Sequence, residues 1–169
     1  MRHGETLWNR DDLTMGQADI DLSAFGYSQA QAAGQALIEY PIDQIVCSPL
    51  VRCLSTIQPY REKRTTDFSI DSSWAERAWG IYEGRSKSDR ADETSPEGGE
   101  TYTEFADRVS RAVANLHQSK TVLIVSHSGV FRQLCKIGFV PEGVVGPPPH
   151  ATPIVFRTGS VQKHRPLKR

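Results

Sequence analysis

The chain has 169 residues, a length that suits one domain with a single core and requires neither disulfides nor a structural metal. Its 20 lysines and arginines balance 20 aspartates and glutamates, which argues against bulk attraction to nucleic acid or to an anionic membrane. Three cysteines without metal-binding spacing, no secretory signal and no membrane-spanning apolar run predict a soluble, cytoplasmic protein with reduced thiols.

The first residues of the chain carry the side chains that a phosphate site needs. Arg2, His3 and Gly4 follow one another directly. Arginine offers a fixed fork of donors that fits a phosphoryl group, histidine can act as nucleophile or general base, and glycine lets the backbone approach a ligand closely. Alone, Arg-His-Gly-Glu could equally form a surface turn, so a phosphate site requires partners elsewhere in the chain.

Helix and strand patterns begin after a polar segment, residues 10–22, that reads as a loop. Ser23 can cap a helix of about residues 24–39, in which apolar side chains recur at helical spacing, and Pro41 closes it. Residues 44–47 form a short apolar run, which predicts a buried strand.

A second helix is expected directly after this strand. It begins at Ser48 and Pro49, with the proline in its first turn, and it carries Arg52. Because proline interrupts helical hydrogen bonding, the helix is expected to end before Pro59.

The middle of the chain is less regular. Residues 68–70 predict a short strand, and the segment that follows holds Glu76. Residues 85–99 are charged and contain glycines, which is typical of a mobile surface loop.

Regular patterns resume with a capping box formed by Thr101 and Glu104. The helix that follows carries one apolar stripe, made of Phe105, Val109, Ala112, Val113 and Leu116. Residues 121–125 predict the clearest strand, which delivers His127 at its end, and Gly129 to about Gly138 resume as helix.

Residues 138–153 contain three successive prolines and read as a rigid connection to a last strand near residues 154–156. Helices that alternate with short β-branched runs predict a single α/β domain, with a mainly parallel sheet covered by helices on both faces. Ligands of such sheets bind beyond the carboxyl ends of the strands, and Ser48 and His127 follow two of those ends.

Over nearly its whole length the sequence resembles the histidine phosphatase superfamily, which includes the cofactor-dependent phosphoglycerate mutases and many small-molecule phosphatases. Four motifs in this order are a strong signal, whereas each alone is weak. The matching segments are Arg2-His3-Gly4-Glu5-Thr6, Trp8-Asn9, Gly16 with Asp19, Leu22-Ser23, Gly26 with Gln29-Ala30, Ser48-Pro49-Leu50 with Arg52 and Thr56, Glu76 with Gly80, Glu83-Gly84, Gly98-Gly99-Glu100 and Ser126-His127-Ser128-Gly129.

The resemblance implies a role for six residues. His3 would be the nucleophile that takes the phosphoryl group and forms a phosphohistidine. Glu76 would protonate the leaving oxygen and afterwards help to remove a proton from the attacking water. The residues that would bind the phosphoryl oxygens are Arg2, Asn9, Arg52 and His127.

The chemistry of these side chains agrees with those roles. Phosphoryl transfer spreads negative charge over equatorial oxygens, so fixed cationic donors can supply most of the catalysis without a metal. Two arginines near His3 favour its unprotonated, attacking form by like-charge repulsion, whereas a bound dianion opposes it. A glutamate that acts as an acid near neutral pH needs a raised pKa, through burial or the incoming phosphate charge.

Each residue also has a structural interpretation. His127 at a strand end could be a core histidine, and Arg52 could pair with a surface aspartate. Glu76 is the least secure by chemistry alone, because Glu83 lies in the same segment.

The sequence departs from the family pattern at its start. Relatives usually carry a hydrophobic strand before the Arg-His-Gly motif, but only Met1 precedes it here, which puts the placement of His3 in question. Trp79 stands where mutases have tyrosine, and the segment between Gly84 and Gly98 lacks their long basic insertion. These departures favour a phosphatase over a mutase.

The resemblance therefore implies a histidine phosphatase domain over residues 1–162, followed by a basic tail at 163–169. We expect a phosphoric monoester hydrolase that needs no metal or other cofactor and acts on a small phosphorylated metabolite, with no nucleic-acid or membrane partner. A cofactor-dependent phosphoglycerate mutase and a non-catalytic phosphate-binding or regulatory protein are the alternatives. The sequence leaves the oligomeric state and the substrate open.

Overall fold

The structure, a computed structural model, describes residues 1–90 and 95–158. Its centre is a parallel sheet of three strands, β1 (Gln44–Cys47), β2 (Asp67–Ile70) and β3 (Val122–Val125), in the order β2-β1-β3. Gln44 of β1 lies opposite Asp67 on one side and Val122 on the other. The three predicted strands of the sheet are thereby confirmed.

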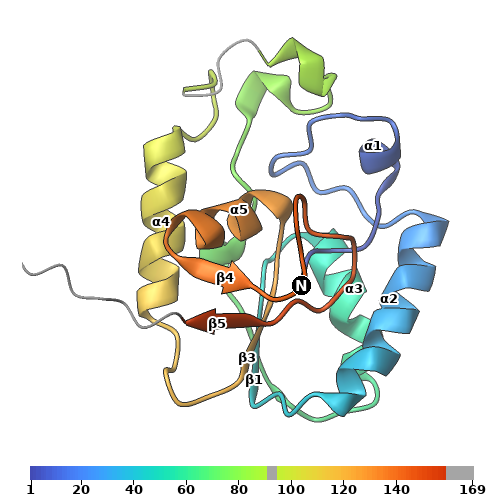
Figure 1. The fold of residues 1–169 in the computed structure, drawn as a ribbon. Coiled ribbons are helices and arrows are strands. Elements are labelled where there is room, and N and C mark those ends of the chain that lie inside the picture. The colour runs from blue at the N-terminus through green and yellow to red at the C-terminus, as the bar shows by residue number, and fades with distance from the viewer. Residues whose placement is uncertain (91–94, 159–169) are drawn as a thin grey trace, which may run out of the picture.

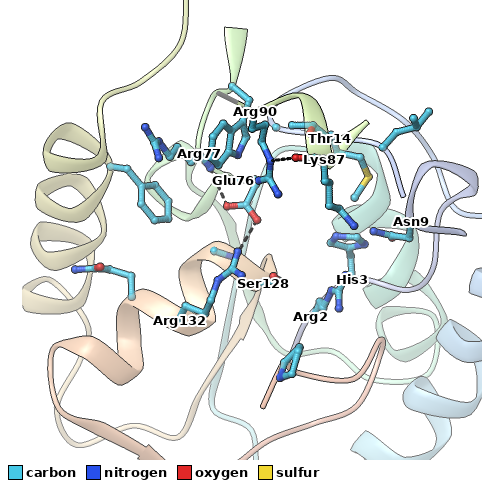
Figure 2. A pocket seen from close by; sticks show the side chains of 18 of the residues that line it. Arg2, His3, Asn9, Thr14, Glu76, Arg77, Lys87, Arg90, Ser128 and Arg132 are labelled. Atoms are coloured by element: carbon cyan, nitrogen blue, oxygen red, sulfur yellow. Dashed lines mark hydrogen bonds between the residues drawn. The ribbon is translucent and has the colours of Figure 1, made fainter. Parts of the chain in front are cut away.

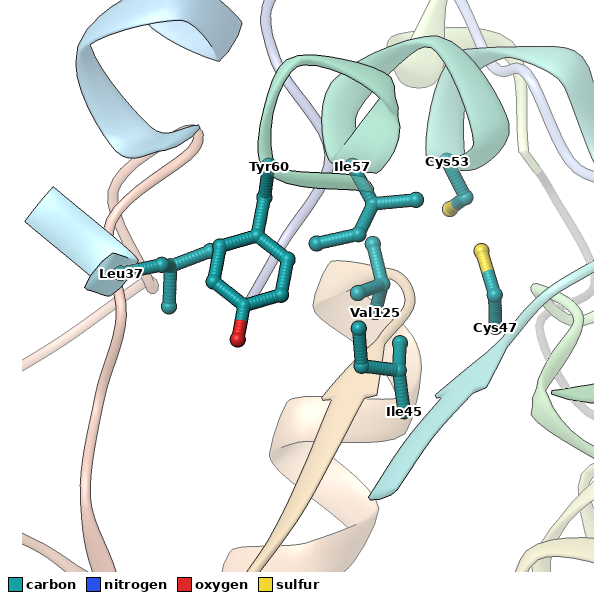
Figure 3. Close-up of a cluster of buried hydrophobic side chains, with 7 residues drawn as sticks. All are labelled: Leu37, Ile45, Cys47, Cys53, Ile57, Tyr60 and Val125. Atoms are coloured by element: carbon teal, nitrogen blue, oxygen red, sulfur yellow. The ribbon is translucent and has the colours of Figure 1, made fainter. Parts of the chain in front are cut away.

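Helices α2 (Ala24–Ala36) and α3 (Val51–Arg61) cover one face of this sheet. Ser23 caps α2 as predicted, by accepting a hydrogen bond from the backbone N–H of Gly26. A buried apolar cluster joins these helices to the sheet, as Figure 3 shows. Its members are Leu37, Ile45, Cys47, Cys53, Ile57, Tyr60 and Val125.

Helices α4 (Tyr102–Ala114) and α5 (Ser128–Lys136) lie on the opposite face. The predicted capping box of Thr101 and Glu104 begins α4, and its apolar stripe packs into a second buried cluster. That cluster contains Val46, Trp74, Phe105, Val109, Ala112, Val130 and Leu134. The single α/β domain with a mainly parallel sheet between two helical layers, predicted from the sequence, is confirmed (Figure 1).

The predicted bounds of α3 were wrong at both ends. The helix begins at Val51, with Leu50 in an extended conformation before it, so Pro49 lies outside the first turn. It also continues through Pro59 to Arg61. Pro59 is buried and packs against Gly34 of α2. This tertiary contact compensates for the helical hydrogen bond that proline cannot donate.

The C-terminal part also differs from the prediction. Residues 139–141 form an unpredicted strand, β4 (Phe139–Pro141), and the last strand, β5 (Phe156–Thr158), begins later than expected. The two pair antiparallel in a separate small sheet. Phe139 and Phe156 lie edge to face, with 6.3 Å between the ring centres. Both pack against the second buried cluster, beneath α4 and α5. Strands β4 and β5 each depend on the other for their backbone hydrogen bonds, and hydrophobic periodicity in the sequence does not indicate such a pairing.

The predicted helix of residues 24–39 is formed by α2 and the 3₁₀ helix η1 (Leu37–Glu39) that follows it directly. Four short helices were not predicted from the sequence, namely α1 (Leu7–Arg10) and the 3₁₀ helices η2 (Ser72–Trp74), η3 (Gly80–Tyr82) and η4 (Lys87–Asp89). Helix η4 lies within the predicted mobile loop of residues 85–99, of which residues 91–94 fall outside the described residues. The predicted basic tail and the domain boundary at residue 162 also fall outside them. None of the described helices has the length and apolar composition that a membrane span requires.

The first residues run beside the outer edge of β3, which carries no further strand among the described residues. His3 N–H donates to the Ser126 carbonyl, Ser126 N–H donates to the Met1 carbonyl, and the Met1 amine donates to the Ile124 carbonyl at 2.6 Å. Beyond this amine a cavity of about 520 Å³ opens between the β3 edge and residues 153–156. His3 is therefore held in place by backbone pairing, although only Met1 and Arg2 precede it.

Candidate active site

A cavity of about 680 Å³ opens beyond the carboxyl ends of β1 and β3. Five of the six residues expected to act in the reaction line it, namely Arg2, His3, Asn9, Arg52 and Glu76. The sixth, His127, is not among the lining residues. Figure 2 shows Arg2, His3 and Asn9 on one side of Glu76, with Arg77 and Arg132 on the other.

His3 is buried, and its ring is oriented by one backbone contact. Nδ1 lies 2.7 Å from the Gly4 carbonyl oxygen. Because a carbonyl only accepts, Nδ1 carries the proton and Nε2 keeps its lone pair. Burial lowers the pKa of His3 well below its usual value, and the charges of Arg52 and Arg2 lower it further. The ring is therefore in the neutral form that a nucleophile needs.

A buried arginine, Arg52, and a half-buried one, Arg2, flank this histidine. Arg52, in the first turns of α3, donates to the carbonyls of Ala18 and Gly16 at 2.8 and 2.7 Å, and Arg2 donates to the Pro148 carbonyl at 3.0 Å. The Nε atoms of both arginines and the hydroxyl of Thr14 are buried without a hydrogen-bond partner among the described residues. Buried polar atoms are rarely unpaired. Because all three side chains line the cavity, an oxygen-rich anion is the ligand that would complete them.

Glu76 faces the cavity from the segment after η2. Its carboxylate accepts from the backbone N–H groups of Gly129 and Arg77, each at 2.9 Å. A Cβ on Gly129 would collide with the Glu76 carboxylate, so glycine is required at the start of α5. Glu83, the alternative acid, accepts from the backbone N–H groups of Gln17 and Trp79 and does not line the cavity. This placement favours Glu76, which the resemblance had indicated, over Glu83, which side-chain chemistry alone had left open.

His127 lies behind His3, with 5.3 Å between the ring centres. Its Nε2 is 2.8 Å from the Ser48 hydroxyl and 3.6 Å from the Cys53 sulfur. Burial lowers the pKa of His127 well below its usual value, and the charges of Arg52, His3 and Arg2 add to this effect. His127 thus contacts His3 and the ends of both strands, whereas its contact with phosphate stays a prediction.

Asn9 reaches the cavity from α1. Its side-chain oxygen accepts from the Thr6 backbone N–H at 3.1 Å, as part of a capping box. This contact orients the carboxamide and leaves its N–H₂ group as the donor for a ligand.

The cavity also contains five cationic residues to which the sequence analysis gave no role, namely Arg77, Lys87, Arg90, Arg132 and Lys136. Arg77 and Arg90 each lie 4.5 Å from the centre of the Trp79 ring. Arg132 and Lys136 are four residues apart on α5, a spacing that could have indicated a shared helix face near His127. Lys87 and Arg90 both come from η4 and its C-terminal end, Arg77 comes from the segment after η2, and nothing in the sequence marks their convergence.

Within the described ranges no three His, Cys, Asp or Glu side chains are grouped to hold a metal ion. The donors of this cavity are guanidinium and ammonium groups, which bind anions.

Comparison with known proteins assigns this arrangement to a family. The sequence profile of the histidine phosphatase superfamily (branch 1) matches residues 1–139. The chain is 33% identical over 141 residues to PhoE of Bacillus subtilis, named an uncharacterized phosphatase, covering 79% of this chain and 72% of that protein. It is 30% identical over 154 residues to phosphoglycerate mutase-like protein 4 of Arabidopsis thaliana, covering 79% and 67%.

Solved structures agree with the sequence comparisons. The alpha-ribazole phosphatase of Shigella flexneri superposes with a TM-score of 0.72 at 32% identity, over 82% of this chain and 78% of that one. A mycobacterial glucosyl-3-phosphoglycerate phosphatase does so with a TM-score of 0.69 at 27% identity, over 80% and 76%. The chain is therefore similar in sequence and in fold to proteins named as phosphatases.

Proposed function

Because the chain belongs to the histidine phosphatase superfamily, with phosphoglycerate mutase-like relatives, we propose that it hydrolyses a small phosphomonoester through a phosphohistidine on His3. The observation that carries this proposal is the environment of His3. The ring is buried and neutral, its Nδ1 proton is held by Gly4, and two arginines with unpartnered Nε atoms flank it. These features support His3 as a nucleophile whose phosphate donors are oriented before substrate arrives.

In the first step, the Nε2 lone pair of His3 attacks phosphorus, and the bond from phosphorus to the ester oxygen breaks. Arg2 and Arg52 stabilise the charge on the equatorial oxygens, with Asn9 and His127 as further donors. Protonated Glu76 gives its proton to the leaving oxygen, so an alcohol departs instead of an alkoxide.

In the second step, water attacks the phosphohistidine. Glu76, now ionised, accepts a proton from that water while the bond from phosphorus to Nε2 breaks. Inorganic phosphate forms, and His3 returns to its neutral state. The same carboxylate thus serves as acid and then as base, and no metal takes part in either step.

The test is rapid-quench labelling with a ³²P-labelled phosphomonoester in the presence of a chelator. We expect a protein-bound phosphoryl group that is stable to base, labile to acid and located on His3. His3→Ala should abolish both label and turnover, while His117→Ala, a change at an exposed histidine, should alter neither. Turnover without label in the wild-type protein would contradict the covalent route.

A cofactor-dependent phosphoglycerate mutase is the second candidate, favoured by the match to a phosphoglycerate mutase-like protein. It predicts interconversion of 2- and 3-phosphoglycerate that depends on a bisphosphoglycerate primer. The hydrolase instead releases inorganic phosphate with or without the primer. If no aryl or alkyl phosphate turns over but inorganic phosphate binds, the non-catalytic binding protein is the better description.

A further inference from the structure

The cavity beside His3 is larger and more cationic than one phosphoryl group requires. Its volume of about 680 Å³ lies in the range of sites for whole small molecules, about 300–1,000 Å³. Glu76 is the only carboxylate among its lining residues. The cations among them are Arg2, Arg52, Arg77, Lys87, Arg90, Arg132 and Lys136. Because basic and acidic residues are equal in number over the whole chain, the excess of positive side chains in this cavity indicates a strongly anionic ligand.

A phosphoryl dianion accounts for only part of this charge. Arg2 and Arg52 flank His3 and match the two charges of the dianion. Lys87 is already paired with Asp12, at 2.5 Å between Nζ and Oδ1. Arg90, Arg132 and Lys136 then remain among the lining cations, and Glu76 is the one carboxylate among the lining residues that can offset their charge.

Arg132 is the clearest member of this second group. It projects from α5 and lies below Glu76 in the view of Figure 2. It has no hydrogen bond or ion pair with any residue that the structure describes, and it is exposed to the cavity solvent. Burial lowers the pKa of Arg2 to about 10, and the positive charges of Arg132 and Arg52 contribute to this lowering. An anion near Arg132 would relieve this repulsion between arginines.

The neighbouring cations are held in place by other contacts. Lys136, one turn further along α5, donates to the Tyr102 hydroxyl at 2.9 Å. Arg90 donates through Nε to the Lys87 carbonyl at 3.3 Å, and its guanidinium lies 4.5 Å from the Trp79 ring centre. Both residues add positive potential to the cavity from different elements, and these contacts restrain their side chains.

We propose that the substrate carries a second anionic group, a carboxylate or a further phosphate, which Arg132 binds while Arg90 and Lys136 supply the surrounding positive potential. This inference rests on the proposed phosphatase function and narrows its substrate class to phosphomonoesters with a second acid group. Arg132 is then a specificity-determining residue, because it contacts a part of the substrate that does not react.

The experiment compares kcat/KM within two matched pairs of substrates. 3-Phosphoglycerate and glycerol 3-phosphate differ by a carboxylate, and fructose 1,6-bisphosphate and fructose 6-phosphate differ by a phosphate. We expect the more anionic member of at least one pair to be preferred roughly ten- to hundredfold, because a hydrogen bond to a charged group is among the strong ones. The pair that responds identifies the anion.

Variants then assign the preference to a residue. Arg132→Ala should reduce the ratio within the responding pair about tenfold, and Arg132→Lys should restore part of it. Arg111→Ala, on the exposed side of α4 and outside the cavity, is the matched control for net charge and should leave the ratio unchanged.

Equal turnover of both members in both pairs would overturn the inference, and so would a preference that Arg132→Ala leaves intact. Para-nitrophenyl phosphate has no second acid group. Its turnover tests the phosphatase function alone, so failure of one proposal can be distinguished from failure of the other.

Discussion

Among single residues, Glu76, the proposed acid, differs from Glu83 in its position relative to the cavity. Glu76 and Glu83 lie in one segment, and both accept backbone N–H groups. Only Glu76 borders the cavity that contains His3, because Gly129 leaves room for its carboxylate at the start of α5. The position of the proposed acid therefore depends on a glycine more than fifty residues away in the chain.

This position predicts how Glu76→Gln affects different substrates. An alkoxide leaving group needs a proton in the transition state, whereas para-nitrophenolate does not. The variant should slow hydrolysis of an alkyl phosphate by about 10²–10⁴-fold and that of para-nitrophenyl phosphate far less. Glu83→Gln is the comparison, and steady-state kcat on both substrates is the measurement. Equal losses on the two substrates would assign Glu76 a role other than the acid.

A second prediction concerns the buried histidines His3 and His127. Burial lowers the pKa of both in the folded state, so below pH 6.5 the unfolded chain binds more protons than the folded one. Stability is therefore complete above this pH and is lost as pH falls, by about 1.4 kcal/mol per pH unit for each histidine.

Urea unfolding at pH 7.5 and 5.5 measures this loss of stability. The variant His127→Gln removes the contribution of His127 and leaves that of His3. The variant keeps a polar partner for Ser48 but has no proton to gain, so it should lose about 1 kcal/mol less than the wild type over this interval. His117→Gln, at an exposed position, should follow the wild type. An unchanged slope in His127→Gln would indicate that His127 titrates normally.

The individual site residues differed in how well the sequence could identify them. Arg2, His3 and Arg52 lie in motifs whose order along the chain is informative, and the structure brings them to one cavity. Arg90 and Arg132 belong to no motif. They line the same cavity only because the tertiary structure brings the segment after Trp79 and α5 to it from different parts of the chain.

Among the elements, α3 shows where local rules were outweighed. A proline inside a helix predicts its end, yet α3 passes through Pro59 because the ring packs into α2 at Gly34. Strand positions were predicted well since β1 and β3 are short apolar runs whose side chains pack into the clusters on both faces of the sheet. Strands β4 and β5 were missed or shifted, because each depends on the other for its pairing.

The contact between α2 and α3 makes Gly34→Ala informative. In an exposed helix interior this change stabilises a protein by about 1 kcal/mol. Here the added Cβ would lie 2.9 Å from Pro59 Cβ and 3.0 Å from the Tyr60 nitrogen. We therefore expect the opposite sign, a loss of about 1–3 kcal/mol in the free energy of unfolding.

Ala32→Gly, at an exposed position of the same helix, is the control. It should cost about 1 kcal/mol through helix propensity alone. Urea unfolding of both variants measures these changes in the free energy of unfolding. A Gly34→Ala protein that is more stable than the wild type would show that α2 and α3 can move apart at little cost in free energy.

For the whole molecule, the outer edge of β3 is the least complete part of the core. The cavity of about 520 Å³ beside it is lined largely by apolar side chains from both helical layers and from the β4–β5 sheet. Its walls include Leu37, Val113, Leu116, Val122, Ile124, Phe131 and Phe156. A parallel strand in this position would pair with β3 and be buried on both faces, as β1 is.

Four apolar, β-branched residues added ahead of Met1 should therefore stabilise the protein. Burial of their side chains contributes about 1.5–3 kcal/mol each, against about 1–2 kcal/mol per residue for ordering the backbone, so we expect a net gain of roughly 2 kcal/mol. The extension also replaces the buried Met1 amine, whose pKa burial lowers from 8.0 to about 6. Because the unfolded chain binds a proton on this amine more tightly than the folded chain does, the free energy of unfolding decreases as pH falls from 8 to 6.

The free energy of unfolding, measured at pH 8 and pH 6, separates the effect of apolar burial from the effect of removing the amine. A Gly-Ser-Gly-Ser extension of equal length is the control. Both extensions remove the amine, so both should abolish its share of the pH dependence. Only the apolar extension fills the cavity beside β3, so only it should raise the free energy of unfolding at pH 8 clearly above that of the original chain. Equal stability of the two extended proteins would mean that the β3 edge does not accept a strand, and that backbone pairing of residues 1–3 alone holds His3 in the active site.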